Sequence, residues 1–89
     1  MNYKHLKYFR AVAHEGRLTK AAETLNLSQS ALSTQIRQLE AQLGHALFER
    51  TGRTLSLTEA GRVALDYADM IFAAGDELES TLKAGGGAG

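Results

Sequence analysis

The chain has 89 residues, of which 44% are hydrophobic and 22% are charged, and it contains no cysteine. This length allows one small hydrophobic core, so we expect a single domain with an appended element. The absence of cysteine excludes disulfide and thiolate chemistry and is typical of a reducing compartment. No apolar run approaches the roughly 18 residues of a membrane span, and the N-terminus lacks a secretory-signal pattern, so we expect a cytoplasmic protein without membrane contact.

The formal net charge is zero at pH 7, but the two signs are separated along the chain. Residues 1–62 carry nine lysines and arginines against five glutamates, whereas residues 63–89 carry one lysine against five acidic side chains. The first part is therefore net basic by about four charges and the second is net acidic by about as much. Only the first part is suited to contact phosphate groups.

Residues 3–15 predict a first helix, in which Leu6, Phe9 and Val12 form an apolar stripe. Gly16 provides the stop, because glycine readily adopts the left-handed backbone conformation that ends a helix. We expect this helix to have a structural role.

A second, short helix is predicted from Thr19, taken as its N-cap, to Leu25. Asn26 tolerates the left-handed conformation, so the chain turns tightly into the next helix. The small side chains of Ala21 and Ala22 would let the two helices approach closely. Two helices joined in this way form a helix-turn-helix unit.

Residues 28–44 predict the central helix, with Ser28 as the N-cap and Gly44 after its last turn. Apolar side chains at a spacing of three or four define its buried face: Leu32, Ile36, Leu39 and Leu43. The opposite face carries polar groups that could contact DNA: Ser30, Ser33, Thr34 and Arg37.

Residues 46–50 and 54–57 predict two short strands of a β-hairpin wing, joined by a turn in which Gly52 supplies a positive φ. Arg50 and Arg53 lie at or beside its tip, where they could reach a phosphate or enter a narrow minor groove. In an arbitrary hairpin such arginines are more often solvated loop cations. The position directly after a helix-turn-helix favours DNA contact instead.

Thr58 is predicted to cap a long final helix that ends near residue 83 and is roughly 36 Å long. Its apolar stripe consists of Ala60, Ala64, Tyr67, Ile71, Ala74, Leu78 and Leu82. Its other side is acidic and carries Asp66, Asp69, Asp76 and Glu77. The preceding domain is too small to cover the whole stripe, so we expect the uncovered part to pair with a second copy in a two-fold dimer.

These elements divide the chain into a winged helix-turn-helix at 1–58, a dimerisation helix at 59–83 and a glycine-rich tail at 84–89. The tail is expected to be disordered. The predicted fold is mainly α, with three helices and a short wing followed by the long helix.

The ordered set of segments resembles the N-terminal DNA-binding region of LysR-type transcriptional regulators, a bacterial family with a winged helix-turn-helix and a dimerising linker helix. The resemblance covers the chain up to the glycine-rich tail and is carried by residues 6–9, 19–22, 27–33, 35–40, 43–44, 47–50 and 57–61. In addition, residues 2–6 and 67–72 resemble the subgroup that regulates sodium/proton antiporters.

The resemblance implies sequence-specific binding of double-stranded DNA, with the start of the central helix in the major groove. The implied base-reading positions are Gln29, Ser30, Ala31, Ser33 and Thr34. The Gln29 amide can pair with adenine through two hydrogen bonds, and the Ala31 methyl group can touch a thymine methyl. The other implied DNA contacts are Lys20, Ser28, Arg37, Arg50 and Thr51, with Arg53 in the minor groove. Arg37 could alternatively hydrogen-bond within the protein.

The resemblance also implies a homodimer on an imperfect inverted repeat, and a tetramer for full-length members, which carry a C-terminal effector domain. The present chain ends where the hinge to that domain would begin. We therefore expect DNA binding without a cofactor or a small-molecule site.

Three other functions have less support. An enzyme would need a nucleophile with a neighbouring base, which the sequence does not offer. His5, His14 and His45 each stand without a spaced partner for a metal ion. A helical protein-interaction module is the main alternative, but the polar outer face of the central helix lacks the apolar anchors that a partner helix needs.

Overall fold

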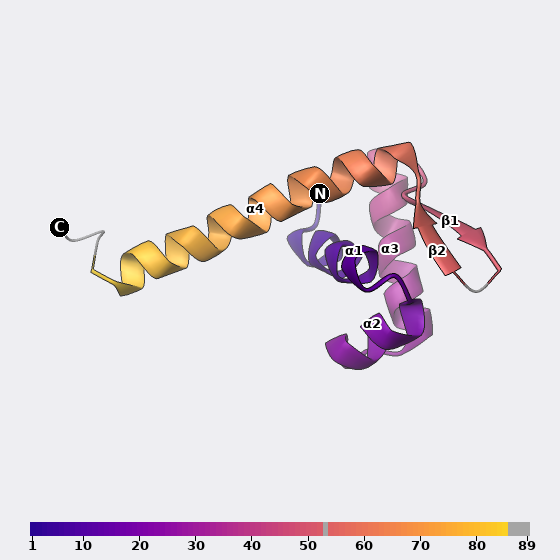
Figure 1. Ribbon diagram of the computed structural model, residues 1–89, viewed down its shortest axis with the longest axis horizontal. Helices are drawn as coiled ribbons and strands as arrows, with labels where there is room; N and C mark the ends of the chain where they lie inside the picture. Colours follow the sequence, from indigo (N-terminus) through magenta and orange to yellow (C-terminus); the bar gives the residue numbers. More distant parts are fainter. Residues whose placement is uncertain (53, 86–89) are drawn as a thin grey trace.

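The computed structural model describes residues 1–52 and 54–85. Four helices and one antiparallel hairpin follow in the order of a winged helix-turn-helix with an added helix (Figure 1). Their bounds are α1 Tyr3–Glu15, α2 Leu18–Leu25, α3 Gln29–Leu43, β1 Phe48–Thr51, β2 Thr54–Leu57 and α4 Glu59–Lys83. The first three helices and the hairpin form a compact body, and α4 extends from it as a long rod.

Polar side chains cap three of the four helices. The Ser28 hydroxyl accepts a hydrogen bond from the Ala31 N–H at 3.1 Å, and the Thr58 hydroxyl accepts one from the Gly61 N–H at 2.9 Å. Asn2 caps α1 in the same way. Each bond satisfies a backbone donor that the first helical turn leaves free, which explains why α3 and α4 begin where the sequence predicts.

The predicted start of α2 is wrong. The N-cap residue is Arg17, which makes no side-chain capping bond, and Thr19 lies inside the first turn. Leu18 is half-buried and packs against the buried cluster formed by α1, α2 and α3. Because burial of this side chain fixes the chain before Thr19, the helix begins two residues earlier than the capping pattern indicates.

The core consists of two adjoining clusters. The first joins α1, α2 and α3 through Tyr8, Val12, Ala21, Ala22, Leu32 and Ile36. The second joins α1, α3 and α4 through Leu6, Phe9, Leu39, Leu47 and Ala68. Leu43 was expected in the buried face of α3 but is 39% exposed, because it lies beyond the last turn that these clusters cover.

The wing is a short antiparallel pair in which Phe48 faces Leu57 and Thr51 faces Thr54. The first strand begins at Phe48 rather than at residue 46, because the Leu47 N–H donates to the Glu40 carboxylate at 2.7 Å and not to the neighbouring strand. Gly52 has the predicted positive φ, at 64°.

The predicted stripe of α4 divides into two parts. Ala60, Ala64 and Ile71 pack against the body, whereas Tyr67 and Leu78 are each 60% exposed. The described residues from 76 to 85 are all exposed. Ala84 and Gly85, predicted to be disordered, form a hydrogen-bonded turn, and residues 86–89 of the predicted tail lie outside the described residues.

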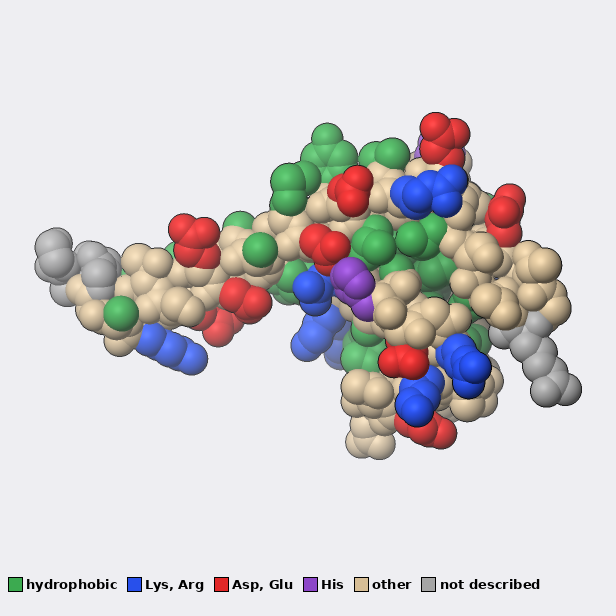
Figure 2. Space-filling model, viewed as in Figure 1, with side chains coloured by type: hydrophobic (Ala, Val, Ile, Leu, Met, Phe, Trp, Pro, Cys, Tyr) green, Lys and Arg blue, Asp and Glu red, His purple; other side chains and the backbone are tan. Residues whose placement is uncertain are grey.

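One of the four acidic side chains named on α4 contacts the body. Asp69 accepts hydrogen bonds from Arg10 and His14 of α1, while Asp66, Asp76 and Glu77 are exposed. Acidic side chains are spread along α4 in Figure 2, whereas most of the Lys and Arg side chains lie on the body. None of the helices in ranges 1–52 and 54–85 is both long and apolar enough to cross a membrane.

Candidate nucleic-acid interface

The outer face of α3 presents polar side chains at its N-terminal end. Gln29, Ser30 and Thr34 are exposed, and Ala31 and Ser33 are half-buried. Ser30, Ala31 and Thr34 line one hollow of the surface, whereas Gln29 and Ser33 each line another. None of these side chains belongs to the buried residues of the helix, which include Leu32 and Ile36.

Hydrogen bonds within α3 distinguish the roles of these groups. The Thr34 hydroxyl donates to the Ser30 carbonyl at 2.8 Å, and the Ser28 hydroxyl lies 3.3 Å from that of Ser30 while it caps the helix. The Gln29 amide makes no hydrogen bond to the described residues, so both its donor and its acceptor are available to a ligand. Gln29 is therefore best placed to read an adenine edge.

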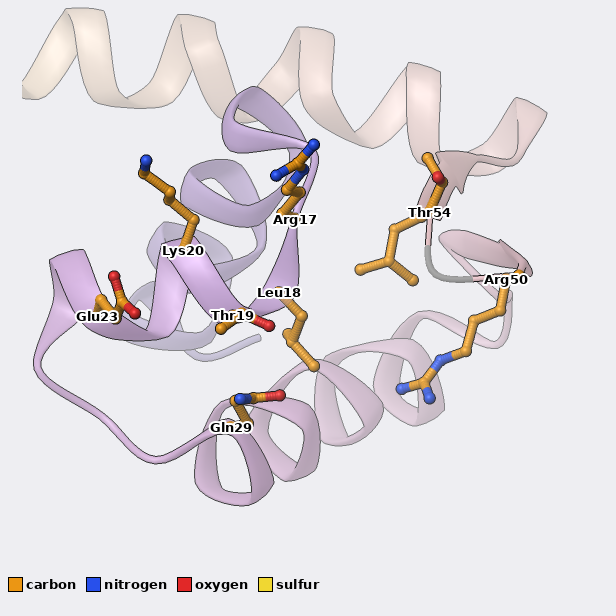
Figure 3. A pocket seen from close by; sticks show the side chains of 10 residues that line it. Arg17, Leu18, Thr19, Lys20, Glu23, Gln29, Arg50 and Thr54 are labelled. Atoms are coloured by element: carbon orange, nitrogen blue, oxygen red, sulfur yellow. The ribbon is translucent and has the colours of Figure 1, made fainter.

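A groove of about 650 Å³ runs between α2, the start of α3 and the wing (Figure 3). We call it the basic groove, because it is lined by Arg17, Lys20 and Arg50 and by a single carboxylate, Glu23. Figure 3 shows Arg50 extending from the wing toward α3, with Gln29 on the facing side. The groove thus combines the Gln29 amide, a predicted base-reading group, with three cations.

Arg17 is a candidate binding residue that the sequence reasoning missed. It is exposed at the start of α2, three positions before Lys20, and it lines the same groove. The signal that could have identified it is this pair of cations one helical turn apart in the basic part of the chain. The ion pairs found among the described residues do not involve either of them.

A smaller hollow of about 180 Å³ lies where α3 meets the wing, and Ser33, Arg37 and Arg50 contribute to its lining. Arg37 is exposed and makes no hydrogen bond to another described residue, so the alternative of an internal role has no contact to support it. Thr51 is exposed at the end of β1. Arg53, predicted as the minor-groove residue, lies outside the described residues.

An apolar hollow of about 800 Å³ lies elsewhere on the molecule and shares no lining residue with the basic groove. Four of the predicted dimer residues line it: Ala60, Ala64, Tyr67 and Ile71. Ala74, Leu78 and Leu82 are not among its lining residues. Met1, Leu43 and Val63 also line it and are 69%, 39% and 53% exposed, so the sequence reasoning missed part of this surface.

The histidines do not gather into a ligand set in the described part of the chain, where no three His, Asp or Glu side chains lie close enough to hold a metal ion. His14 instead contacts the Asp69 carboxylate at 2.8 Å.

Comparison with known sequences identifies the family. Residues 3–62 match the family model described as "Bacterial regulatory helix-turn-helix protein, lysR family". The RuBisCO operon transcriptional regulator of Allochromatium vinosum is 45% identical over 83 residues, which cover 93% of this chain and 28% of that protein. The HTH-type transcriptional regulator YofA of Bacillus subtilis (strain 168) is 44% identical over 78 residues, covering 88% of this chain and 27% of that protein. The chain thus spans less than a third of these relatives.

Solved structures show the same fold. A complex of the BenM DNA-binding domain with benA site 1 DNA has a TM-score of 0.87 at 40% identity, with 93% of this chain and 96% of that chain covered. The DNA complex of the CbnR DNA-binding domain has a TM-score of 0.86 at 37% identity, with 97% and 99% covered. The predicted winged helix-turn-helix and its linker helix are confirmed, and this chain belongs to the lysR family of bacterial regulatory helix-turn-helix proteins.

Proposed function

We propose that this chain is the DNA-binding part of a LysR-type transcriptional regulator and binds double-stranded DNA sequence-specifically. The observation that carries the proposal is that Gln29, at the exposed start of α3, lines the same groove as the cations Arg17, Lys20 and Arg50. The BenM and CbnR domains, which are similar over almost their whole length, have been crystallised with DNA.

In the proposed complex, α3 enters the major groove, whose width of about 12 Å accommodates one helix. Gln29 pairs with an adenine edge, and the half-buried Ala31 methyl group contacts a thymine methyl. The hydroxyl groups of Ser30, Ser33 and Thr34 supply shorter contacts to bases or phosphates.

The cations around α3 hold the DNA backbone. Lys20 and Arg17 from α2 and Arg50 from the wing line one groove, so a single phosphodiester strand that enters it meets all three. Ser28, Arg37 and Thr51 complete the proposed contact set, together with Arg53 in the minor groove. These contacts contribute affinity and orientation, whereas the base contacts of α3 contribute specificity.

We further propose the division into a DNA-binding domain at 1–58, a dimerisation helix at 59–83 and a tail at 84–89. Two copies pair through the apolar hollow and the exposed stripe of α4, represented by Tyr67 and Leu78. A two-fold dimer presents its two α3 helices to major grooves about 34 Å apart, which suits an imperfect inverted repeat. In the longer protein, an effector domain follows and the dimers pair into tetramers.

This activity belongs in the bacterial cytoplasm, where the DNA is. The basic groove is assigned to DNA and the apolar hollow to the second copy, so neither is assigned to a small molecule or a cofactor. The narrower resemblance to regulators of sodium/proton antiporters stays a prediction.

The salt dependence of binding separates this function from the alternative of a protein-interaction module. We expect the affinity for a duplex to fall steeply as salt rises, because each phosphate contact releases condensed counterions. Arg17→Ala and Lys20→Ala should each lower the slope of log K against log salt by about one. Lys83→Ala, at the far end of α4, is the matched control and should leave the slope unchanged. Failure of the chain to bind duplex DNA even at low salt would contradict the proposal.

A further inference from the structure

One carboxylate connects the DNA-binding body to the rod. Asp69 Oδ1, near the middle of α4, accepts from Arg10 Nε at 2.7 Å and lies 2.8 Å from His14 Nε2. Arg10 and His14 are four positions apart and therefore share one face of α1. Two side chains of α1 thus converge on a single oxygen atom of α4.

Aromatic contacts surround this cluster. The rings of Tyr3 and Phe72 are tilted by 43° to one another with their centroids 4.5 Å apart, and the Arg10 guanidinium lies 5.6 Å from the centroid of Phe72. A side-chain carbon at Gly75 would lie 3.2 Å from the Tyr3 hydroxyl, so glycine at this position leaves room for Tyr3. We call this set the clasp: Tyr3, Arg10 and His14 of α1 with Asp69, Phe72 and Gly75 of α4.

The clasp is the last place where α4 contacts the body. Beyond Gly75, the described part of the helix is exposed on all sides. The other end of α4 is anchored at Gly61, which is buried against Leu47. Between Gly61 and the clasp, α4 packs on the body through the buried Ala68 and the partly buried Ala64. Asp69 lies about 12 Å along the axis from Gly61, so the clasp holds α4 at the end of this contact, where it leaves the body.

The direction of α4 matters for the distance between two reading helices. A tilt of about 10° would displace the far end of a helix of this length by about 6 Å. That displacement is nearly two steps of DNA, since bases are spaced by about 3.4 Å along the helix axis. If two copies pair through α4, the angle between α4 and the body therefore sets which half-site spacing fits.

The exposure of the cluster argues against a mainly stabilising role. The side chains of Arg10 and Asp69 are each 41% exposed, and that of His14 is 51% exposed. Ion pairs in such positions contribute little to global stability. Two hydrogen bonds that converge on one oxygen atom can instead fix the angle between α1 and α4.

We propose that Asp69 is a positioning residue: through Arg10 and His14 it holds α4 at the angle that determines the half-site spacing preferred by the dimer. The role of Asp69 in half-site spacing rests on the proposed function, whereas its role in fixing the angle of α4 does not.

The first test measures the angle without DNA. The chain has no native cysteine, so spin labels can be placed at Thr24→Cys on α2 and Ser80→Cys on α4, both exposed. With labelled chains diluted in unlabelled ones, Asp69→Ala should broaden the distance distribution by about 3–6 Å relative to the parent. Asp66→Ala, an exposed aspartate three positions earlier, is the matched control and should leave the width unchanged. Equal widths in Asp69→Ala and Asp66→Ala would overturn the proposal.

The second test measures binding to duplexes whose two half-sites are separated by successive numbers of base pairs. The ratio of affinities for the best and the next spacing should fall about threefold to fivefold in Asp69→Ala and stay constant in Asp66→Ala. Affinity for a single half-site should be the same in all three proteins, which a general loss of structure would not allow. An unchanged spacing ratio in Asp69→Ala would refute the role in spacing. If the parent chain does not bind a single half-site, the proposed function is wrong. The spin-label result would still decide whether Asp69 fixes the angle of α4.

Discussion

The contacts of Asp69 with α1 lower the pKa of its carboxyl group. Hydrogen bonds from His14 and then Arg10 hold the pKa of its carboxyl group below the ordinary value of 3.8. A carboxyl group whose pKa is depressed by folding stabilises the folded state when it is ionised. This contribution is therefore fully present above the pKa of the unfolded chain and is lost as the pH falls through the lower, folded value.

A pH titration of stability tests this sign. The free energy of unfolding should be higher in the parent chain than in Asp69→Asn at neutral pH. The difference should begin to shrink below about pH 4, where the unfolded carboxyl group becomes protonated, and should vanish once the pH is below the lower pKa of the folded chain. Urea unfolding at successive pH values measures the difference. Asp66→Asn serves as the control, and a difference that grows on acidification would show that the sign is wrong.

At the scale of elements, the ends of helices are the most predictable features because their causes are local. Ser28 and Thr58 cap α3 and α4 as expected, since the capping hydroxyl and its N–H partner are three residues apart. The start of α2 was missed because Leu18 is held by distant core residues. The exposure of Leu43 likewise depends on where other helices end, and the spacing of residues within α3 does not predict this.

The candidate site shows the same limit. The polar face of α3 could be predicted from helical periodicity, which places Ser30 and Thr34 opposite the buried Leu32. The basic groove could not, because it brings Arg17 together with Arg50 from elements far apart in the sequence. The contacts of Asp69 with α1 also depend on how two distant helices cross.

Two glycines of α4 provide a matched test of packing. A Cβ atom at Gly61 would overlap the backbone carbonyl of Leu47, so Gly61→Ala should destabilise the protein by about 1–3 kcal/mol. Gly75 meets only the end of the exposed, flexible Tyr3 side chain, so Gly75→Ala should gain up to about 1 kcal/mol from helix propensity. Chemical denaturation measures both changes. Destabilisation of equal size by the two substitutions would contradict this packing.

At the scale of the whole molecule, the body and the rod have separate tasks. The molecule measures 52 × 26 × 18 Å, and its long axis follows α4 (Figure 1). Basic side chains line the groove on the body, and exposed apolar side chains line the hollow beside α4. The two proposed tasks, DNA binding and pairing with a second copy, therefore use separate surfaces.

Tyr67 is the best position at which to test the dimer. It is 60% exposed in the apolar hollow, whereas Ile71 is partly buried against the body and its replacement would also disturb the core. We expect Tyr67→Lys to sediment as a monomer, because a lysine would place an unpaired charge in the apolar interface. Asp76→Lys, on the opposite side of α4, should remain a dimer. A dimeric Tyr67→Lys would move the interface to another surface.

The central claim is that the outer face of α3 reads bases. Selection of bound duplexes from a random pool, by the parent chain and by Gln29→Ala, tests it most directly. The parent should enrich an imperfect inverted repeat, and Gln29→Ala should lose about 1–3 kcal/mol of discrimination at one base pair in each half-site while the other positions are kept. Identical base preferences in the two selections would contradict the claim.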